Sequence, residues 1–109
     1  MPFEEVRRLR EPLRLLRDVF GDARMEPLDQ YLVMAERHGL AVEVETDLTD
    51  ATRPTFTRWR ENAERYRLEV VASLGFSDWV RFVQACDVLE AFWDDGTLGY
   101  GLLVAQRPF

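Results

Sequence analysis

The sequence contains no lysine, one cysteine and one histidine among its 109 residues. All 14 basic residues are arginine and the formal net charge is −6, which argues against nucleic acid as an electrostatic partner. Because Cys86 has no second cysteine to pair with, an internal disulfide is excluded and we expect a cytoplasmic protein. No apolar run approaches the ~20 residues of a membrane-spanning helix, so we expect no membrane association.

The sequence also lacks the short motifs that mark common catalytic and metal sites. It has no nucleophile elbow, no HExxH, no CxxC and no Ser/His/Asp set. Carboxylates alternate at Glu43, Glu45 and Asp47, but no histidine or cysteine joins them, so they indicate the solvated face of a strand. His38 has no partner nearby in sequence and is read as a helix-end residue. We therefore predict no catalytic and no metal-binding residue.

Two stretches have the patterns of β-strands. Residues 40–48 alternate between apolar and charged side chains, and the side chains expected to face inward are Leu40, Val42, Val44 and Leu48. Residues 97–106 carry no charge and are apolar on both faces. A strand of the second kind needs cover on both faces and a neighbour on each edge. We therefore predict an edge strand at 40–48 and a central strand at 97–106.

Helical periodicity accounts for most of the remaining sequence. The first apolar stripe consists of Val6, Leu9, Leu13, Leu16 and Phe20. Pro12 interrupts it, and we expect a kink or a new helix start there. A second helix is expected to begin with Pro27 as its first residue and to end at Gly39, and aromatic stripes in 54–93 predict two helices packed as a hairpin. The predicted fold class is α+β, with about four helices and two antiparallel strands.

The predicted sheet is incomplete. Two strands do not make an independently stable sheet, and 40–48 can cover only one edge of 97–106. The other edge would expose a row of unpaired backbone groups with no charge to protect it. We expect a protein partner, or a second copy of this chain, to pair at the edge of 97–106.

Four segments carry a resemblance to a known family: 25–32, 38–44, 46–62 and 92–108. The more specific motifs are Thr-Arg-Pro at 52–54 followed by Arg-Trp-Arg-Glu-Asn at 58–62, and Trp-Asp-Asp-Gly-Thr-Leu-Gly-Tyr-Gly at 93–101. The sequence resembles the C-terminal part of bacterial class I S-adenosylmethionine-dependent methyltransferases that act on small molecules. The resemblance covers the chain from about residue 12 onward. It implies one partial domain, 1–109, with a helix-helix-strand part (12–48), a helical lid (54–93) and the last strand (97–106).

The family's architecture implies which strand is missing. Its last strand inserts antiparallel between the fifth and sixth strands of a Rossmann-like sheet, so the resemblance makes 40–48 the sixth strand and 97–106 the seventh. The family's cofactor site lies in the first four strands, and no residue here matches its glycine-rich loop or its acidic ribose-binding residue. The resemblance therefore implies S-adenosylmethionine for the complete enzyme, and no cofactor for the isolated chain.

The resemblance also implies a lid over a small-molecule acceptor. The candidate acceptor contacts are Arg53, Arg58, Trp59, Trp93 and Tyr100. Aromatic walls would exclude water and arginine could hold a carboxylate, while core packing is the alternative for the two tryptophans.

Four interpretations of function stay open at this point. The chain is part of a split or truncated methyltransferase, inactive alone; or a regulatory subunit of an intact one; or a non-catalytic homodimeric binding module; or a decayed or mis-started reading frame.

Overall fold

A computed structural model describes the backbone of residues 3–23 and 25–108 and the side chains of 8–23 and 25–108, so the side chain of Val6 lies outside the described part. The elements in chain order are α1 (Phe3–Phe20), α2 (Leu28–Arg37), β1 (Ala41–Asp47), α3 (Thr49–Thr52), α4 (Pro54–Arg65), α5 (Arg67–Leu74), α6 (Phe76–Asp95) and β2 (Gly101–Gln106). The α+β class and the two antiparallel strands are confirmed. The predicted number of about four helices was slightly low, because the described part has five helices of at least 8 residues besides the 4-residue α3.

Helix α1 runs through Pro12 without a new start, so of the two alternatives expected there the new start was wrong. Pro12 cannot donate to the carbonyl of Arg8, but Arg8 is exposed and water can satisfy that carbonyl. Leu9 and Leu16, on either side of the proline, are both 4% exposed. The packing of these two leucines therefore stabilises the helix across its weak point.

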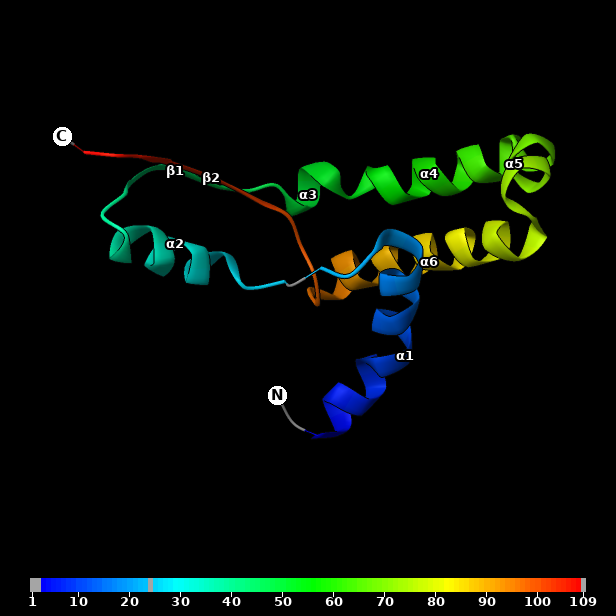
Figure 1. Ribbon diagram of the computed structural model, residues 1–109, viewed down its shortest axis with the longest axis horizontal. Helices are drawn as coiled ribbons and strands as arrows, with labels where there is room; N and C mark the ends of the chain where they lie inside the picture. The colour runs from blue at the N-terminus through cyan, green and yellow to red at the C-terminus, as the bar shows by residue number, and fades with distance from the viewer. Residues whose placement is uncertain (1–2, 24, 109) are drawn as a thin grey trace.

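The main core lies where α1 crosses α6 (Figure 1). Leu9 and Leu16 of α1 pack with Ala85 and Phe92 of α6. Arg81 of α6 adds a hydrogen bond of 2.8 Å to the carboxylate of Asp18 on α1. Such exposed pairs contribute little free energy, so the apolar contacts determine this crossing.

Helices α4 and α6 lie side by side as the predicted hairpin (Figure 1). Phe56 and Trp93 are buried between them, with ring centroids 4.6 Å apart. Arg60 of α4 donates to Asp87 at 2.6 Å and to Glu90 at 2.5 Å, both on α6. Hydrogen bonds to Glu90 and then Asp87 raise the pKa of Arg60. This clamp fixes the register of the two helices.

The first helix of the hairpin is broken at Tyr66, where the sequence pattern predicted continuity. Tyr66 has φ −104° and ψ 27° and separates α4 from α5. Beyond the break, the Arg67 guanidinium lies 4.9 Å from the centroid of Trp79 and 5.7 Å from that of Phe76. The break lets α5 turn against α6, a tertiary contact that periodicity alone does not predict.

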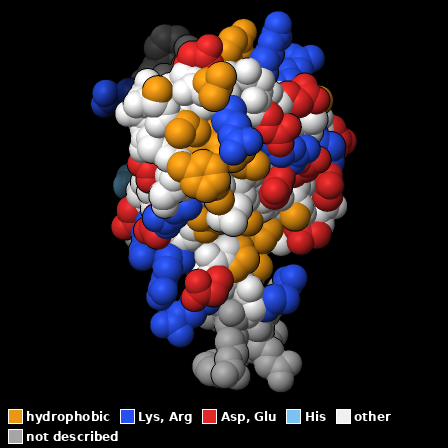
Figure 2. Space-filling model, turned by 90° about the vertical axis from the view of Figure 1, so that its right-hand side faces the viewer, with side chains coloured by type: hydrophobic (Ala, Val, Ile, Leu, Met, Phe, Trp, Pro, Cys, Tyr) orange, Lys and Arg blue, Asp and Glu red, His pale blue; other side chains and the backbone are white. Residues whose placement is uncertain are grey.

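The α5 end of the hairpin exposes several large apolar side chains. Leu68 is 84% exposed, Leu74 63% and Phe76 56%. Figure 2 views the molecule from this end and shows hydrophobic side chains bordered by charges of both signs.

Strands β1 and β2 pair antiparallel in a two-stranded sheet, and α2 packs against it. The register shifts between Val42 and Val44: Val42 pairs with Ala105, and Val44 pairs with Val104. Because Val104 and Ala105 are consecutive, they point to opposite faces, and so do their partners. The prediction that Val42 and Val44 share one inner face was therefore wrong.

Strand β2 begins at Gly101 rather than at residue 97. The four preceding residues are held by other contacts. The backbone N–H of Thr97 donates to Asp95 at 2.9 Å, and that of Leu98 donates to the Phe92 carbonyl at 3.3 Å. Leu98 packs against the helical core, so this segment joins α6 to the sheet without extending the strand.

Within the described residues, one edge and one face of the β1–β2 sheet lack cover. Among the described residues, β2 pairs only with β1. A Cβ on Gly101 would lie 3.0 Å from Leu28 of α2, so Gly101 faces α2, and Leu102 and Val104 face away from it. Leu102 is 45% exposed and Val104 41%. The radius of gyration is 17.3 Å, against about 13 Å for a compact domain of this length.

The lone thiol gives a first prediction. Cys86 is 0% exposed, and burial raises its pKa to about 11, as expected for an inert core thiol. At pH 8, alkylation of the native protein by iodoacetamide should be about a hundredfold slower than in urea, because the thiolate fraction falls with the raised pKa. The neutral Cys86 thiol should make its full contribution to the free energy of unfolding below the unfolded pKa near 9. This contribution should be lost as the pH rises through 11.

The matched control moves the thiol along the same helix. A Cys86→Ala, Ala91→Cys variant places it at an exposed position of α6, where alkylation should be fast in the native state. Equal native rates for the two proteins, measured by mass spectrometry, would contradict a closed core at Cys86.

Candidate binding site

A cavity of about 1230 Å³ opens between α1, α4 and α6, close to the segment that leads into β2. Residues from four elements, α1, α3, α4 and α6, and from two connecting segments line it. They are Arg10, Leu13, Arg14, Leu16, Arg17, Phe20, Gly21, Asp22, Ala23, Met25, Thr52, Thr55, Phe56, Trp59, Leu89, Trp93 and Tyr100. The structure thus brings together three of the five predicted acceptor contacts, Trp59, Trp93 and Tyr100.

The aromatic wall of the cavity is partly core and partly open. Trp93 is 8% exposed, and its indole N–H donates to the Thr52 hydroxyl at 3.0 Å. Trp59 is 40% exposed and lies 5.6 Å from Phe56 and 6.0 Å from Phe20, centroid to centroid. Trp93 therefore anchors the wall, and Trp59 forms its open surface.

The rim of the cavity is basic. Arg10, Arg14 and Arg17 are spaced by four and three residues, which places them on one face of α1 next to Leu13. Asp22 is the acidic residue that lines the cavity. These arginines were not among the predicted site residues, although their helical spacing beside the apolar stripe was a usable signal.

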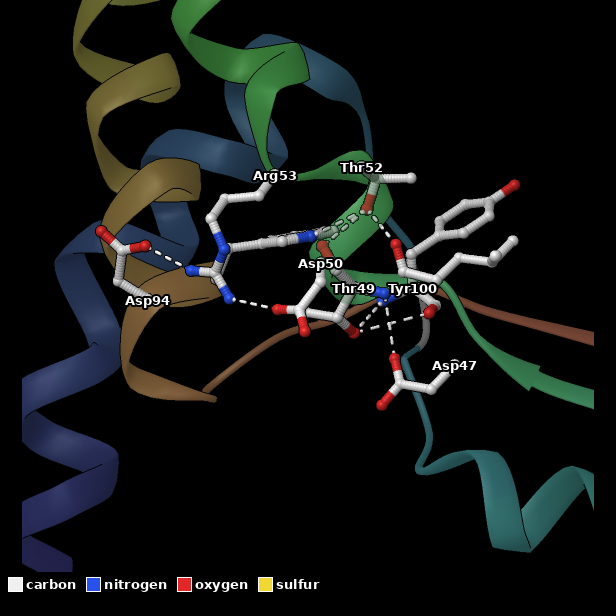
Figure 3. A network of polar contacts seen from close by, with 9 residues as sticks. Asp47, Thr49, Asp50, Thr52, Arg53, Asp94 and Tyr100 are labelled. Carbon is white, nitrogen blue, oxygen red and sulfur yellow. Dashed lines mark hydrogen bonds and ion pairs between the residues drawn. The ribbon is translucent and has the colours of Figure 1, made fainter.

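Tyr100 is positioned by Thr49 (Figure 3). The Tyr100 backbone N–H donates to the Thr49 hydroxyl at 3.1 Å, and Leu48 N–H donates to the Tyr100 carbonyl at 2.8 Å. Thr49 is fixed in turn by Asp47, whose carboxylate accepts from the Thr49 N–H at 2.9 Å. Hydrogen bonds from the Thr49 side chain, then from its backbone, lower the pKa of Asp47. The link between β1 and α3 therefore sets where Tyr100 enters the cavity wall.

The two predicted arginines lie outside the cavity. Arg53 donates to Asp94 and, at 2.9 Å, to Asp50, and these bonds raise its pKa (Figure 3). Arg58 lines a separate hollow of about 420 Å³ with Asn62, and Trp59 borders both spaces. Arg53 thus links α3 to the end of α6, and neither guanidinium faces the cavity that holds Trp93.

The residues that line the cavity are suited to binding a ligand. In the described part of the chain, no group of three or more His, Cys, Asp or Glu side chains could hold a metal ion. His38 is exposed at the end of α2, where its backbone N–H donates to the carbonyls of Met34 and Ala35. No helix within residues 3–23 and 25–108 has the length and hydropathy to cross a bilayer. The cavity offers apolar surface and guanidinium donors for a ligand.

Gly99 gives the second prediction. A Cβ at Gly99 would lie 2.5 Å from the Thr49 hydroxyl oxygen, and moving that hydroxyl would weaken its bond to Tyr100. Gly99→Ala should lower the free energy of unfolding by about 1–3 kcal/mol. In a Thr49→Ala background the same change should cost much less, because the clashing atom is gone.

Gly101→Ala is the comparison variant. Its Cβ would meet the flexible end of Leu28 at 3.0 Å, so a smaller loss is expected in urea unfolding. If Gly99→Ala cost the same with and without Thr49, the contact between Gly99 and Thr49 would not be the cause.

No protein-family model matches this chain, and neither the curated proteins nor the solved structures gave a match.

Proposed function

We propose that this chain supplies the lid and the sheet end of a class I S-adenosylmethionine-dependent methyltransferase acting on a small molecule. It would be inactive alone, and a partner chain or an N-terminal half would supply the fifth strand and the cofactor site. The observation that carries the proposal is the edge of β2, which has no neighbour among the described residues. Charge, proline and a covering helix usually protect such an edge, and β2 carries neither charge nor proline.

The exposed face of the β1–β2 sheet supports the same proposal. Val44, Leu102 and Val104 lie on the side away from α2 and are each 41–45% exposed. In a Rossmann-like sheet both faces are covered by helices, so this apolar face fits a second layer supplied by the partner. The antiparallel pairing of β1 with β2 agrees with the orientation expected for the sixth and seventh strands.

The cavity supports the lid role. Trp59, Trp93 and Tyr100 line a hollow of about 1230 Å³ beside the helical pair. Aromatic walls of this kind exclude water from a small acceptor, which helps transfer between desolvated groups.

A second candidate function is a non-catalytic homodimeric binding module, or a regulatory subunit of an intact methyltransferase. The observation that favours it is that α1, α3, α4 and α6 of one chain already form a cavity of about 1230 Å³. Ligand binding would then need no partner, and the β2 edge would serve only for assembly.

Val104→Lys tests the role of the β2 edge. In the absence of another partner, wild-type chains should pair through this edge, and light scattering should give the mass of two or more chains. Val104→Lys should give a monomer, because a charge at an edge strand opposes pairing. Val33→Lys on α2 is the control: Val33 is 44% exposed, close to the 41% of Val104, and its substitution should leave the mass unchanged. The same mass for all three proteins would rule out association through β2.

Cofactor binding tests the methyltransferase assignment. In equilibrium dialysis with labelled S-adenosylmethionine, the isolated chain should bind none at micromolar concentration. If adjacent coding DNA encodes a strand followed by a glycine-rich loop, its product co-expressed with this chain should form a complex that binds the cofactor. Micromolar binding by the chain alone would overturn the proposed division of the site, and a complex that binds no cofactor would overturn the methyltransferase role.

A further inference from the structure

We propose that the cavity between α1, α4 and α6 binds an elongated apolar molecule that ends in a carboxylate. Describing this molecule as the methyl acceptor rests on the proposed function, whereas its binding does not. The inference comes from the lining of the cavity, which combines large apolar side chains with three arginines of α1.

The floor of the cavity selects an apolar body. Leu13 is 41% exposed, Phe20 45% and Trp59 40%, and all three line the same hollow. Phe20, Trp59 and Phe82 form a cluster of three rings: the centroid of Phe20 lies 6.0 Å from each of the other two, and those two lie 6.5 Å apart. Burying these surfaces under a ligand is favourable because it removes apolar area from water. The volume of about 1230 Å³ accommodates a long chain or a multi-ring body.

The rim selects a negative head group. The protein as a whole is acidic, with a net charge of −6, yet the described residues that line this cavity include three arginines and one aspartate. The local charge is therefore opposite in sign to that of the protein. Arginine presents its donors in a planar fork that matches a carboxylate, and it is less strongly hydrated than lysine. The surplus of arginine over aspartate in the described lining suits an anionic head group.

The rim arginines keep donors available for a ligand. Arg14 lies 3.8 Å from Glu11, and their side chains are 50% and 78% exposed. Arg17 lies 3.9 Å from Asp18, which also accepts from Arg81 at 2.8 Å. Long, exposed pairs of this kind hold arginine weakly. Within the described residues, Arg10 forms no ion pair, so Arg10 and Arg14 are the residues we assign to the carboxylate.

A set of ten-carbon probes tests the proposal on the complete chain without cofactor or partner. Decanoate, decanol, decylamine and decyl phosphate share one apolar body and differ in the head group. Isothermal titration calorimetry should show decanoate binding about tenfold more tightly than decanol, and decylamine more weakly than decanol. Decanol binding equal to that of decanoate would remove the arginine rim from recognition, and tighter binding of decyl phosphate would overturn the choice of a carboxylate.

The three tryptophans locate the bound probe. Trp59 and Trp93 line the cavity, whereas Trp79 lies elsewhere, with its indole N–H donating to the Ala63 carbonyl at 2.7 Å. In ¹⁵N-correlated NMR spectra, decanoate should shift the indole signals of Trp59 and Trp93 and leave that of Trp79 in place. A shift confined to Trp79 would place the ligand outside this cavity.

Arginine variants separate the head-group contact from the apolar one. The double variant Arg10→Gln, Arg14→Gln should weaken decanoate binding about tenfold and change decanol binding less than about twofold. Arg37→Gln, at an exposed position on α2, should change neither. If the double variant kept the preference for decanoate, the assignment to Arg10 and Arg14 would be wrong. A negative result in these ligand-binding experiments would not decide the proposed function, because the light-scattering and cofactor-binding experiments test it independently.

Discussion

The pairing of β1 with β2 is the constraint on which the rest of the structure depends. These strands are joined through α3, α4, α5 and α6, so their pairing closes a loop that contains the whole helical hairpin. Loop closure of this length costs only slightly more entropy than closure of a shorter loop. The pairing also brings Thr49, just after β1, against Tyr100, just before β2. Sheet register and cavity wall are therefore set by the same contact.

The helical part and the sheet differ in how well they are packed. The crossing of α1 and α6 buries Leu9, Leu16, Ala85 and Phe92, and no buried side-chain polar atom in the described part lacks a hydrogen-bond partner. The β1–β2 sheet has α2 on one face and, among the described residues, no comparable cover on the other. Stability should be highest around α6 and lowest along β2, because protection follows buried apolar contact. The part of the molecule that we propose to recruit a partner is thus the part that gains most from one.

The sequence predicted the fold class, strand β1 and the helical hairpin, since each depends on a regular pattern within a short window. Contacts between distant residues explain the errors. Leu9 and Leu16 carry the helix through Pro12, Arg67 on Trp79 favours the break at Tyr66, and Thr49 holds the residues before Gly101 outside the strand. For the cavity, the aromatic residues were predicted, while the choice of arginines required knowing which face of α1 borders α4.

The shifted register in β1 has a consequence for changes in chain length. Glu43 is the residue left over when Val42 pairs with Ala105 and Val44 pairs with Val104. Deleting Glu43 would make the two valines consecutive and restore a regular ladder with the same partners, so every side chain would keep its face. Elsewhere in the strand, loss of one residue would invert the faces of all the residues on one side of it. Position 43 is therefore the place in β1 where the evolutionary insertion or deletion of a residue would disturb the β1–β2 sheet least.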